Sequence, residues 1–178
     1  MRKILTAATI AIATLALFAG YRQAQSDSEG WREIAWPFPR DGWPAGRAFR
    51  CATEWCGGDI EVFVRPKAGF CNCDSGVADD DEVDRVADLD LISEHFAPLQ
   101  PGRAINIADM AGRIRPYELG MSDGSRHAAI GIAVSRRCDL LVAVARGKGD
   151  AMGVRRVVLE FLGSTDMMRW MTAAMDGR

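Results

Sequence analysis

Residues 128–145, AAIGIAVSRRCDLLVAVA, carry the clearest structural signal in the chain. The first half alternates bulky residues (Ile130, Ile132) with small ones (Gly131, Ala133), and this period of two is typical of a β-strand. Both faces are apolar, so we expect this strand at the centre of a sheet, with its small-residue face open to close approach by a helix. A turn at residues 136–137 leads into a second apolar run at 140–145. Two strands joined so closely pair antiparallel.

Weaker strand signals lie on both sides of this stretch. Apolar residues alternate over 60–64, and residues 48–51 are expected to pair with them across a turn at 53–58. Downstream, residues 105–107 and 114–117 are predicted to be strands, with a turn at Ala111 and Gly112 between them. A further turn is predicted at Asp123 and Gly124, an Asp-Gly pair that suits a hairpin.

Three helices are predicted around these strands. One begins near Asp79, which has Glu82 three residues on as in a capping box, and it presents apolar residues up to Leu91. Two more follow at the C-terminus over 154–162 and 164–175, separated by Gly163. The predicted class is therefore α+β: a mostly antiparallel sheet with one helix after the first hairpin and two C-terminal helices packed on it.

The N-terminal residues 1–26 have the composition of an export signal. Arg2 and Lys3 precede an apolar run over 4–19, and Ala24 and Ser26 have the spacing of a signal-peptidase site. Cleavage there would remove three basic residues and lower the formal net charge from −2 to −5. We expect a periplasmic or exported protein; an uncleaved inner-membrane anchor that leaves the domain facing the periplasm is the alternative.

Residues 27–47 form a segment rich in tryptophan and proline, which we call the arm, and residues 48–178 form a single domain. Its prolines exclude a regular helix, and its aromatic residues are too many for a solvated linker. We expect the arm to lie over the domain with its indoles packed down. The alternative is an exposed aromatic strip that binds a partner, through Trp31, Trp36 and Trp43.

Five cysteines are present, at Cys51, Cys56, Cys71, Cys73 and Cys138. In an oxidising compartment such a group is most often a set of disulfides. Cys51 and Cys56 bracket the predicted hairpin turn and are expected to be bonded, and Cys138 is expected to pair with Cys71 or Cys73. One thiol is left over. The alternative assigns Cys71 and Cys73 to thiol exchange or to copper binding, as a C-x-C pair of soft ligands.

Other residues suggest chemistry more weakly. The C-terminal methionines could join the cysteines around Cu(I), but Met167, Met171 and Met175 are spaced as a buried helix face requires. The acidic run at 79–84 lacks a calcium-loop spacing and suits a helix N-terminus. No hydrolase motif is present around His95 or His127. The sequence also contains no P-loop and no dinucleotide-binding motif.

The function that these features favour is a non-catalytic accessory or binding protein of the bacterial cell envelope. Its expected partner is another envelope protein, and no cofactor or resident metal is expected. The weakly negative net charge argues against nucleic-acid binding. Contact with the membrane is expected only through residues 1–26, if they are retained.

Overall fold

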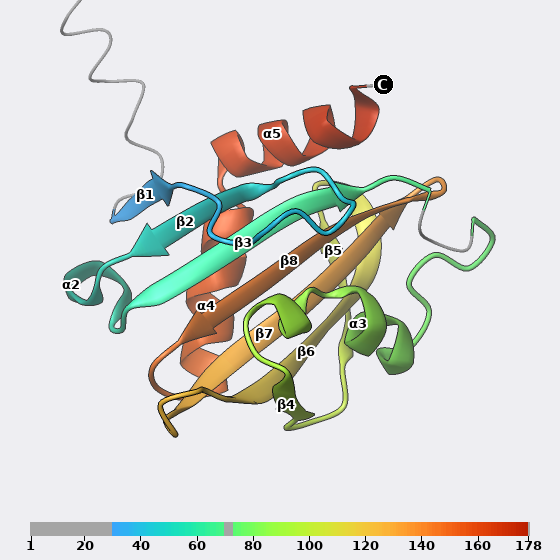
Figure 1. Cartoon of the computed structure of the whole chain (residues 1–178). Coiled ribbons are helices and arrows are strands. Elements are labelled where there is room, and N and C mark those ends of the chain that lie inside the picture. Colours follow the sequence, from blue (N-terminus) through green and yellow to red (C-terminus); the bar gives the residue numbers. More distant parts are fainter. Residues whose placement is uncertain (1–29, 70–72, 178) are drawn as a thin grey trace, which may run out of the picture.

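The computed structural model describes residues 30–69 and 73–177. Within them, eight strands form one antiparallel sheet in the order β1-β2-β3-β8-β7-β6-β4, and β5 pairs with the other end of β6 (Figure 1). The predicted α+β class is confirmed. The strands are β1 (Trp31–Ile34), β2 (Arg47–Cys51), β3 (Ile60–Lys67), β4 (His95–Pro98), β5 (Arg103–Ile107), β6 (Met110–Gly120), β7 (Arg126–Arg136) and β8 (Asp139–Gly147).

Helices cover both faces of the sheet. The long C-terminal helices α4 (Ala151–Leu162) and α5 (Thr165–Asp176) pack on one face. The other face carries α3 (Asp80–Val86), the 3-10 turn η1 (Leu89–Leu91) and part of the arm, all in front of the sheet in Figure 1. A four-residue helix, α2 (Thr53–Cys56), lies in the turn between β2 and β3. No helix of the described part of the chain is long and apolar enough to cross a membrane.

The central position predicted for residues 128–134 is correct, because β7 lies between β6 and β8. Ile130 and Ile132 point into the core under α4 and α5. On the opposite face, a Cβ atom added to Gly131 would lie 3.0 Å from Ala87 Cβ, just after α3. The small residues of this face therefore allow α3 to pack directly on the sheet, as the sequence indicates.

The turn predicted at Ala111 and Gly112 is wrong. The chain reverses at Ala108 and Asp109, which both adopt left-handed backbone conformations, and Gly112 lies inside β6 opposite Val134. A Cβ atom at position 112 would come within 2.0 Å of the carbonyl oxygen of Ala133. This glycine is thus required for close approach between two strands and not for a turn.

The predicted N-termini of α3 and α5 hold, after Asp79 and Ser164. α4 begins at Ala151, three residues before the start expected at 154. The side chains of Asp79, Asp150 and Ser164 accept hydrogen bonds from the first turns of α3, α4 and α5. The helix predicted to reach Leu91 is shorter, because Asp88 takes a left-handed conformation and the chain continues as η1. Gly163 separates the two C-terminal helices as expected.

The arm contributes one strand that the sequence does not indicate. β1 pairs with β2 and extends the sheet by one edge strand before the prolines begin. The predicted signal segment, residues 1–26, lies outside the described residues.

Candidate functional site

Two disulfides are present. Cys51 and Cys56 are bonded across α2, with Cα atoms 6.1 Å apart, as their position at the hairpin turn predicts. Cys73 is bonded to Cys138, with a Cα separation of 4.4 Å. The second bond ties the segment after β3 to the turn between β7 and β8. Of the two partners predicted for Cys138, the structure selects Cys73, and Cys71 lies outside the described residues.

This pairing bears on the C-x-C alternative. Because Cys73 is bonded to Cys138, its sulfur is not free to form a pair with Cys71 in this oxidised form. Within residues 30–69 and 73–177, no group of three or more His, Cys, Asp or Glu side chains is arranged to hold a metal ion. Met167, Met171 and Met175 are buried against the sheet, so the spacing of these methionines is explained by the core.

The three tryptophans of the arm do not form one surface. Trp31 stacks on Phe161 of α4, with ring centroids 4.2 Å apart, on the face covered by the C-terminal helices. Trp36 packs edge-on against Phe63 on the opposite face, at 6.1 Å, and Trp43 lies on that side as well. All three are half-buried. Their indoles contact the domain, as the packed-down interpretation of the arm predicts.

A cluster of buried charges lies beneath the arm. Arg65 and Lys67 of β3 are 2% and 5% exposed, and both bind Asp88, which is 6% exposed. Arg65 Nε donates to Asp88 Oδ2 at 2.7 Å, and Lys67 Nζ donates to Asp88 Oδ1 at 2.5 Å. Arg65 also donates to Asp41 of the arm at 2.6 Å. These bonds connect β3, the arm and Asp88, which lies between α3 and η1.

The electrostatic effects in this cluster favour the ionised forms. Hydrogen bonds from Arg65 lower the pKa of Asp41 to about 2. Burial acts to lower the pKa of Arg65, but the hydrogen bonds to Asp88 and Asp41 outweigh it and raise that pKa above its usual range. Every charge described here has an opposite partner, so the cluster fixes the arm to the sheet. The signal in the sequence was a pair of basic residues two apart on one face of an apolar strand.

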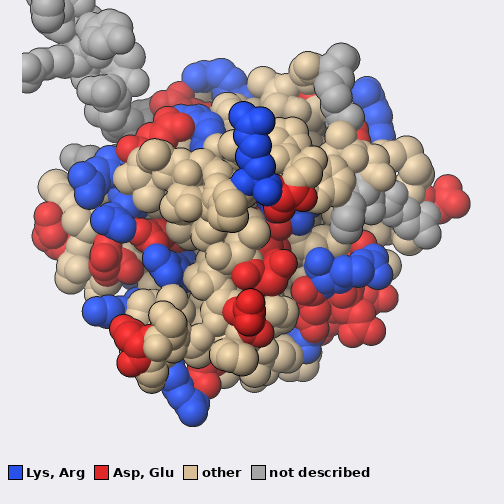
Figure 2. Space-filling view, in the orientation of Figure 1, with Lys and Arg blue, Asp and Glu red and all other residues tan. Residues whose placement is uncertain are grey.

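The acidic run at 79–84 has a structural role. Asp79 caps α3, while Asp80 binds Arg113 and Asp84 binds Arg115, both on β6. The hydroxyl of Tyr117 donates to Asp84 at 2.5 Å, and burial followed by this bond raises the pKa of Tyr117. Acidic side chains gather around α3 in the space-filling view (Figure 2). The run therefore attaches α3 to the sheet through ion pairs.

A groove lies on the other face, between α4 and the strand edge. Its upper wall is the β4–β5 connection, residues 99–101, together with Arg103. Its lower wall is the start of α4, with Ala151, Met152 and Arg155, and its floor is formed by Ile114 and Pro116 of β6. The enclosed part has a volume of about 40 Å³. A shallower hollow of about 420 Å³ shares Met152 and Arg155, adds Arg156, and continues along α4. We call both parts the α4 groove.

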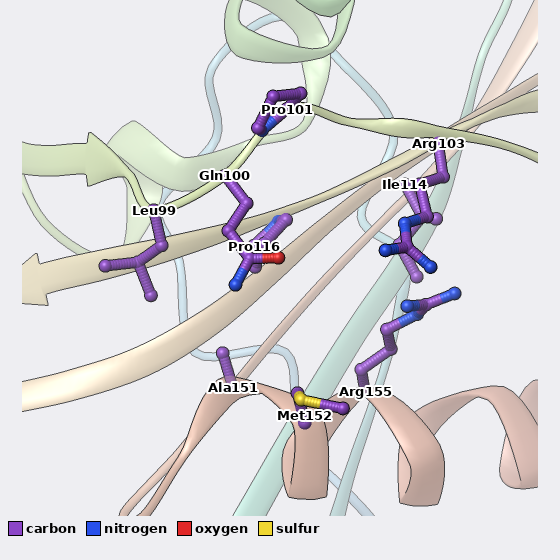
Figure 3. Close-up of a pocket in the computed structure, with 9 residues that line it drawn as sticks. All are labelled: Leu99, Gln100, Pro101, Arg103, Ile114, Pro116, Ala151, Met152 and Arg155. Carbon is purple, nitrogen blue, oxygen red and sulfur yellow. The ribbon is translucent and has the colours of Figure 1, made fainter.

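The side chains of the α4 groove are unusual for this protein in two ways. Figure 3 shows Arg103 and Arg155 reaching into the groove from opposite walls. Within the described ranges, the side chains of Arg103, Arg155 and Arg156 have no ion-pair or hydrogen-bond partner, whereas ten other arginines bind carboxylates. Leu99 and Met152 are 49% and 74% exposed, although both are large and apolar. The groove combines free cations with exposed apolar surface.

Two other hollows differ in this respect. In the hollow beside Trp31, of about 550 Å³, Arg47 binds Glu33 and lowers the pKa of that carboxyl group. In the hollow beside His127, Arg50 and Arg146 both bind the buried carboxylate of Glu61. Of the arginines that line these two hollows, Arg47, Arg50 and Arg146 are occupied by carboxylates of the chain itself, and Arg32 has no carboxylate partner in the described part of the chain.

Ser125 and His127, the serine and histidine that lie near each other in the sequence, are not arranged for catalysis. Ser125, the residue two before His127, has a buried hydroxyl without a hydrogen-bond partner among the described residues, so the two do not form an oriented pair. The α4 groove was not predicted from the sequence. The sequence feature that could have indicated it is the position of Met152, Arg155 and Arg156 on the side of α4 that faces away from the apolar stripe. In the sequence alone, this side looks like an ordinary solvent-exposed helix face.

No protein-family model and no curated protein matches the sequence. Among solved structures, the solution structure of cyanobacterial PsbP (CyanoP) from Synechocystis sp. PCC 6803 is similar with a TM-score of 0.44 and 13% identity, over 78% of this chain and 84% of that chain. A Pseudomonas aeruginosa protein of unknown function, PA94, is similar with a TM-score of 0.39 and 13% identity, over 76% of this chain and 80% of that chain.

Proposed function

We propose that this chain is an exported, disulfide-stapled accessory protein of the bacterial cell envelope, which binds another envelope protein and carries out no chemistry of its own. The observation that carries the proposal is the α4 groove. It presents exposed Leu99 and Met152 beside arginines that have no partner in the described part of the chain. Methionine and arginine are enriched at protein interfaces, where they contact a partner's side chains.

Export is supported by two independent features. The start of the sequence has the charged and apolar regions of a signal peptide, followed by small residues at Ala24 and Ser26. The domain contains two disulfides, which persist in the periplasm and are rare in the cytoplasm. We therefore place the mature domain in the periplasm, beginning near Asp27, with an uncleaved anchor as the alternative.

We assign the binding surface to the α4 groove and not to the arm. Trp31, Trp36 and Trp43 pack against the domain on two different faces, so a single partner surface would reach only part of this set. The thiol-exchange and copper alternatives require Cys71 and Cys73 to act as a pair, and the bond from Cys73 to Cys138 competes with that pairing.

The proposal is tested by site-specific photocrosslinking in intact cells of the source bacterium. A benzophenone amino acid replaces Met152 in the groove or, as the control, Met168, an exposed methionine on α5. We expect an adduct with an envelope protein from position 152 and none from position 168. Mass analysis of the purified adduct identifies the partner, and the mass of the free protein shows whether it begins near Asp27.

Equal labelling from both positions, or none from position 152, would contradict binding at the groove. An intact Met1 terminus in the membrane pellet would replace the signal peptide by an anchor.

A further inference from the structure

We infer that the α4 groove binds an acidic peptide segment in which carboxylates flank an apolar side chain. This inference rests on the proposed function and names the chemistry of the partner. It is carried by the placement of unpartnered arginines along the α4 groove: Arg103 and Arg155 line its small apolar hollow, and Arg156 lines the shallow continuation. Most other arginines of the described chain are paired with carboxylates.

The first step concerns charge. Arg103, Arg155 and Arg156 bring three guanidinium groups to one groove, and no carboxylate in the described ranges pairs with them. Asp150, which caps α4, is occupied by hydrogen bonds from the backbone of Met152 and Gly153. Like charges gathered at one groove repel one another, so an anionic ligand relieves the repulsion. Guanidinium groups bind carboxylates through paired hydrogen bonds.

The formal net charge shows that this attraction is local. The whole chain carries −2, so an acidic partner gains nothing from a general attraction to the molecule. A cluster of acidic residues lies around α3, on the opposite face of the sheet (Figure 2). An acidic segment is therefore directed to the α4 groove and away from α3.

The second step concerns the apolar part of the ligand. Leu99 stands above the hollow and Met152 below it, and Ile114 and Pro116 form the floor between them (Figure 3). Met152 is 74% exposed, so a partner side chain that enters here removes apolar surface from water on both molecules. The flexible thioether adapts to side chains of different shape.

The third step concerns size and shape. The enclosed part, about 40 Å³, is far smaller than the several hundred Å³ typical of sites for small organic ligands. It suits the end of one aliphatic side chain, and the shallow continuation along α4 suits the extended backbone that carries it. Leu99 and Met152 face each other across a hollow, whereas insertion into a bilayer favours apolar side chains on a protruding surface. A peptide segment is favoured over a lipid surface.

The test uses a fluorescein-labelled dodecapeptide in which pairs of glutamates flank single leucines, and it measures anisotropy with the oxidised protein. We expect saturable binding that weakens steeply with added salt. Replacing the glutamates by lysines should abolish binding, and replacing the leucines by serines should weaken it. The Arg103→Glu, Arg155→Glu double variant should bind at least about tenfold more weakly.

The matched control is the Arg126→Glu, Arg169→Glu variant, which changes the net charge by the same amount at arginines 74% and 72% exposed on β7 and α5. It should bind within about twofold of the unmodified protein. Thermal unfolding of both variants, followed by circular dichroism, confirms that each is folded. A Met152→Glu variant removes the apolar contact and should also weaken binding.

Equal loss in the two double variants would overturn the inference, because it would show a general charge effect. Binding to vesicles that contain phosphatidylglycerol, without binding to the peptide, would also overturn it and assign the groove to a lipid surface. If an adduct forms at position 152 in cells but the acidic peptide does not bind, the inference about peptide chemistry fails and the proposed function stands. If no adduct forms at position 152, the proposed function itself fails.

Discussion

Asp88 is the residue on which the buried cations of β3 depend. Its carboxylate binds both Arg65 and Lys67, and all three side chains are at most 6% exposed. Asp88→Ala should lower the free energy of unfolding by about 3–5 kcal/mol, because it leaves buried positive charge without its partner. Asp90→Ala, two residues on and exposed, should change it by less than about 0.5 kcal/mol. Urea denaturation measures both. Similar small changes in the two variants would mean that water reaches the cluster.

Asp88 also has a left-handed backbone conformation, with φ of 60°. Asparagine tolerates this conformation but carries no charge. Asp88→Asn therefore separates the contribution of the ion pairs from that of the backbone conformation. If it lowers the free energy of unfolding about as much as Asp88→Ala, the stability comes from the ion pairs. If it lowers it much less, the stability comes from the backbone conformation.

Asp41 gives the arm a dependence on pH. Because hydrogen bonds from Arg65 lower its pKa to about 2 in the folded state, from 3.8 when unperturbed, its contribution to stability is fully present above pH 4. It is lost as the pH falls from about 4 towards 2. Asp41→Asn should cost about 1 kcal/mol at neutral pH, since the carboxylate is partly exposed, and less with increasing acidity. Urea denaturation of both proteins from pH 6 to 2.5 measures the difference. If the difference in stability between the two proteins does not change with pH, it arises from packing and not from the charge of Asp41.

At the scale of elements, the position of α3 depends on a small residue in the central strand. A Cβ atom at Gly131 would lie 2.9 Å from the ring of Tyr117 and 3.0 Å from Ala87 Cβ, so Gly131→Ala forces the Tyr117 side chain and the end of α3 to shift. We expect a loss of about 1–3 kcal/mol. Gly120→Ala on β6 is the control, because there the added atom would be no closer than 3.5 Å to its neighbours. Thermal unfolding compares the two. If both variants are equally stable, α3 has room to move.

At the scale of the whole molecule, the two disulfides differ in how much of the chain they close. Cys51 and Cys56 are five residues apart, and Cys73 and Cys138 are 65 apart. In the chain-entropy description, the longer loop contributes about 4 kcal/mol and the shorter about 2 kcal/mol. Replacing both cysteines of a pair by serine should therefore lower the melting temperature more for the 73–138 pair than for the 51–56 pair. Equal effects would show that native packing outweighs loop closure here.

The oxidation state is checked on the same protein. Two disulfides leave one thiol of the five cysteines, so thiol titration of denatured protein prepared without reductant should find a single reactive group. Three or more thiols would contradict the two-disulfide arrangement and would favour the metal-binding alternative for Cys71 and Cys73.

The sequence by itself determined the class of the fold and much of its order. The period of two over 128–134, the apolar faces on both sides and the caps at Asp79 and Ser164 are local signals, and each depends on residues a few positions apart. The hairpin disulfide followed from the same kind of evidence. The pairing of β1 with β2 was not evident from the sequence, because a short strand is stabilised by neighbours from distant parts of the chain. The turn at Ala108 was also missed, because a glycine such as Gly112 indicates close packing as readily as it indicates a turn.

Only the tertiary structure decided where the charges lie relative to one another. Arg65 meets Asp41 and Asp88 from separate segments, and the acidic run at 79–84 meets arginines of β6, so these residues are structural. Arg103 and Arg155 come from a strand and a helix about fifty positions apart and meet at a groove without a carboxylate from the described chain. Whether a charged side chain is neutralised depends on spatial neighbours, which no local pattern of residues encodes.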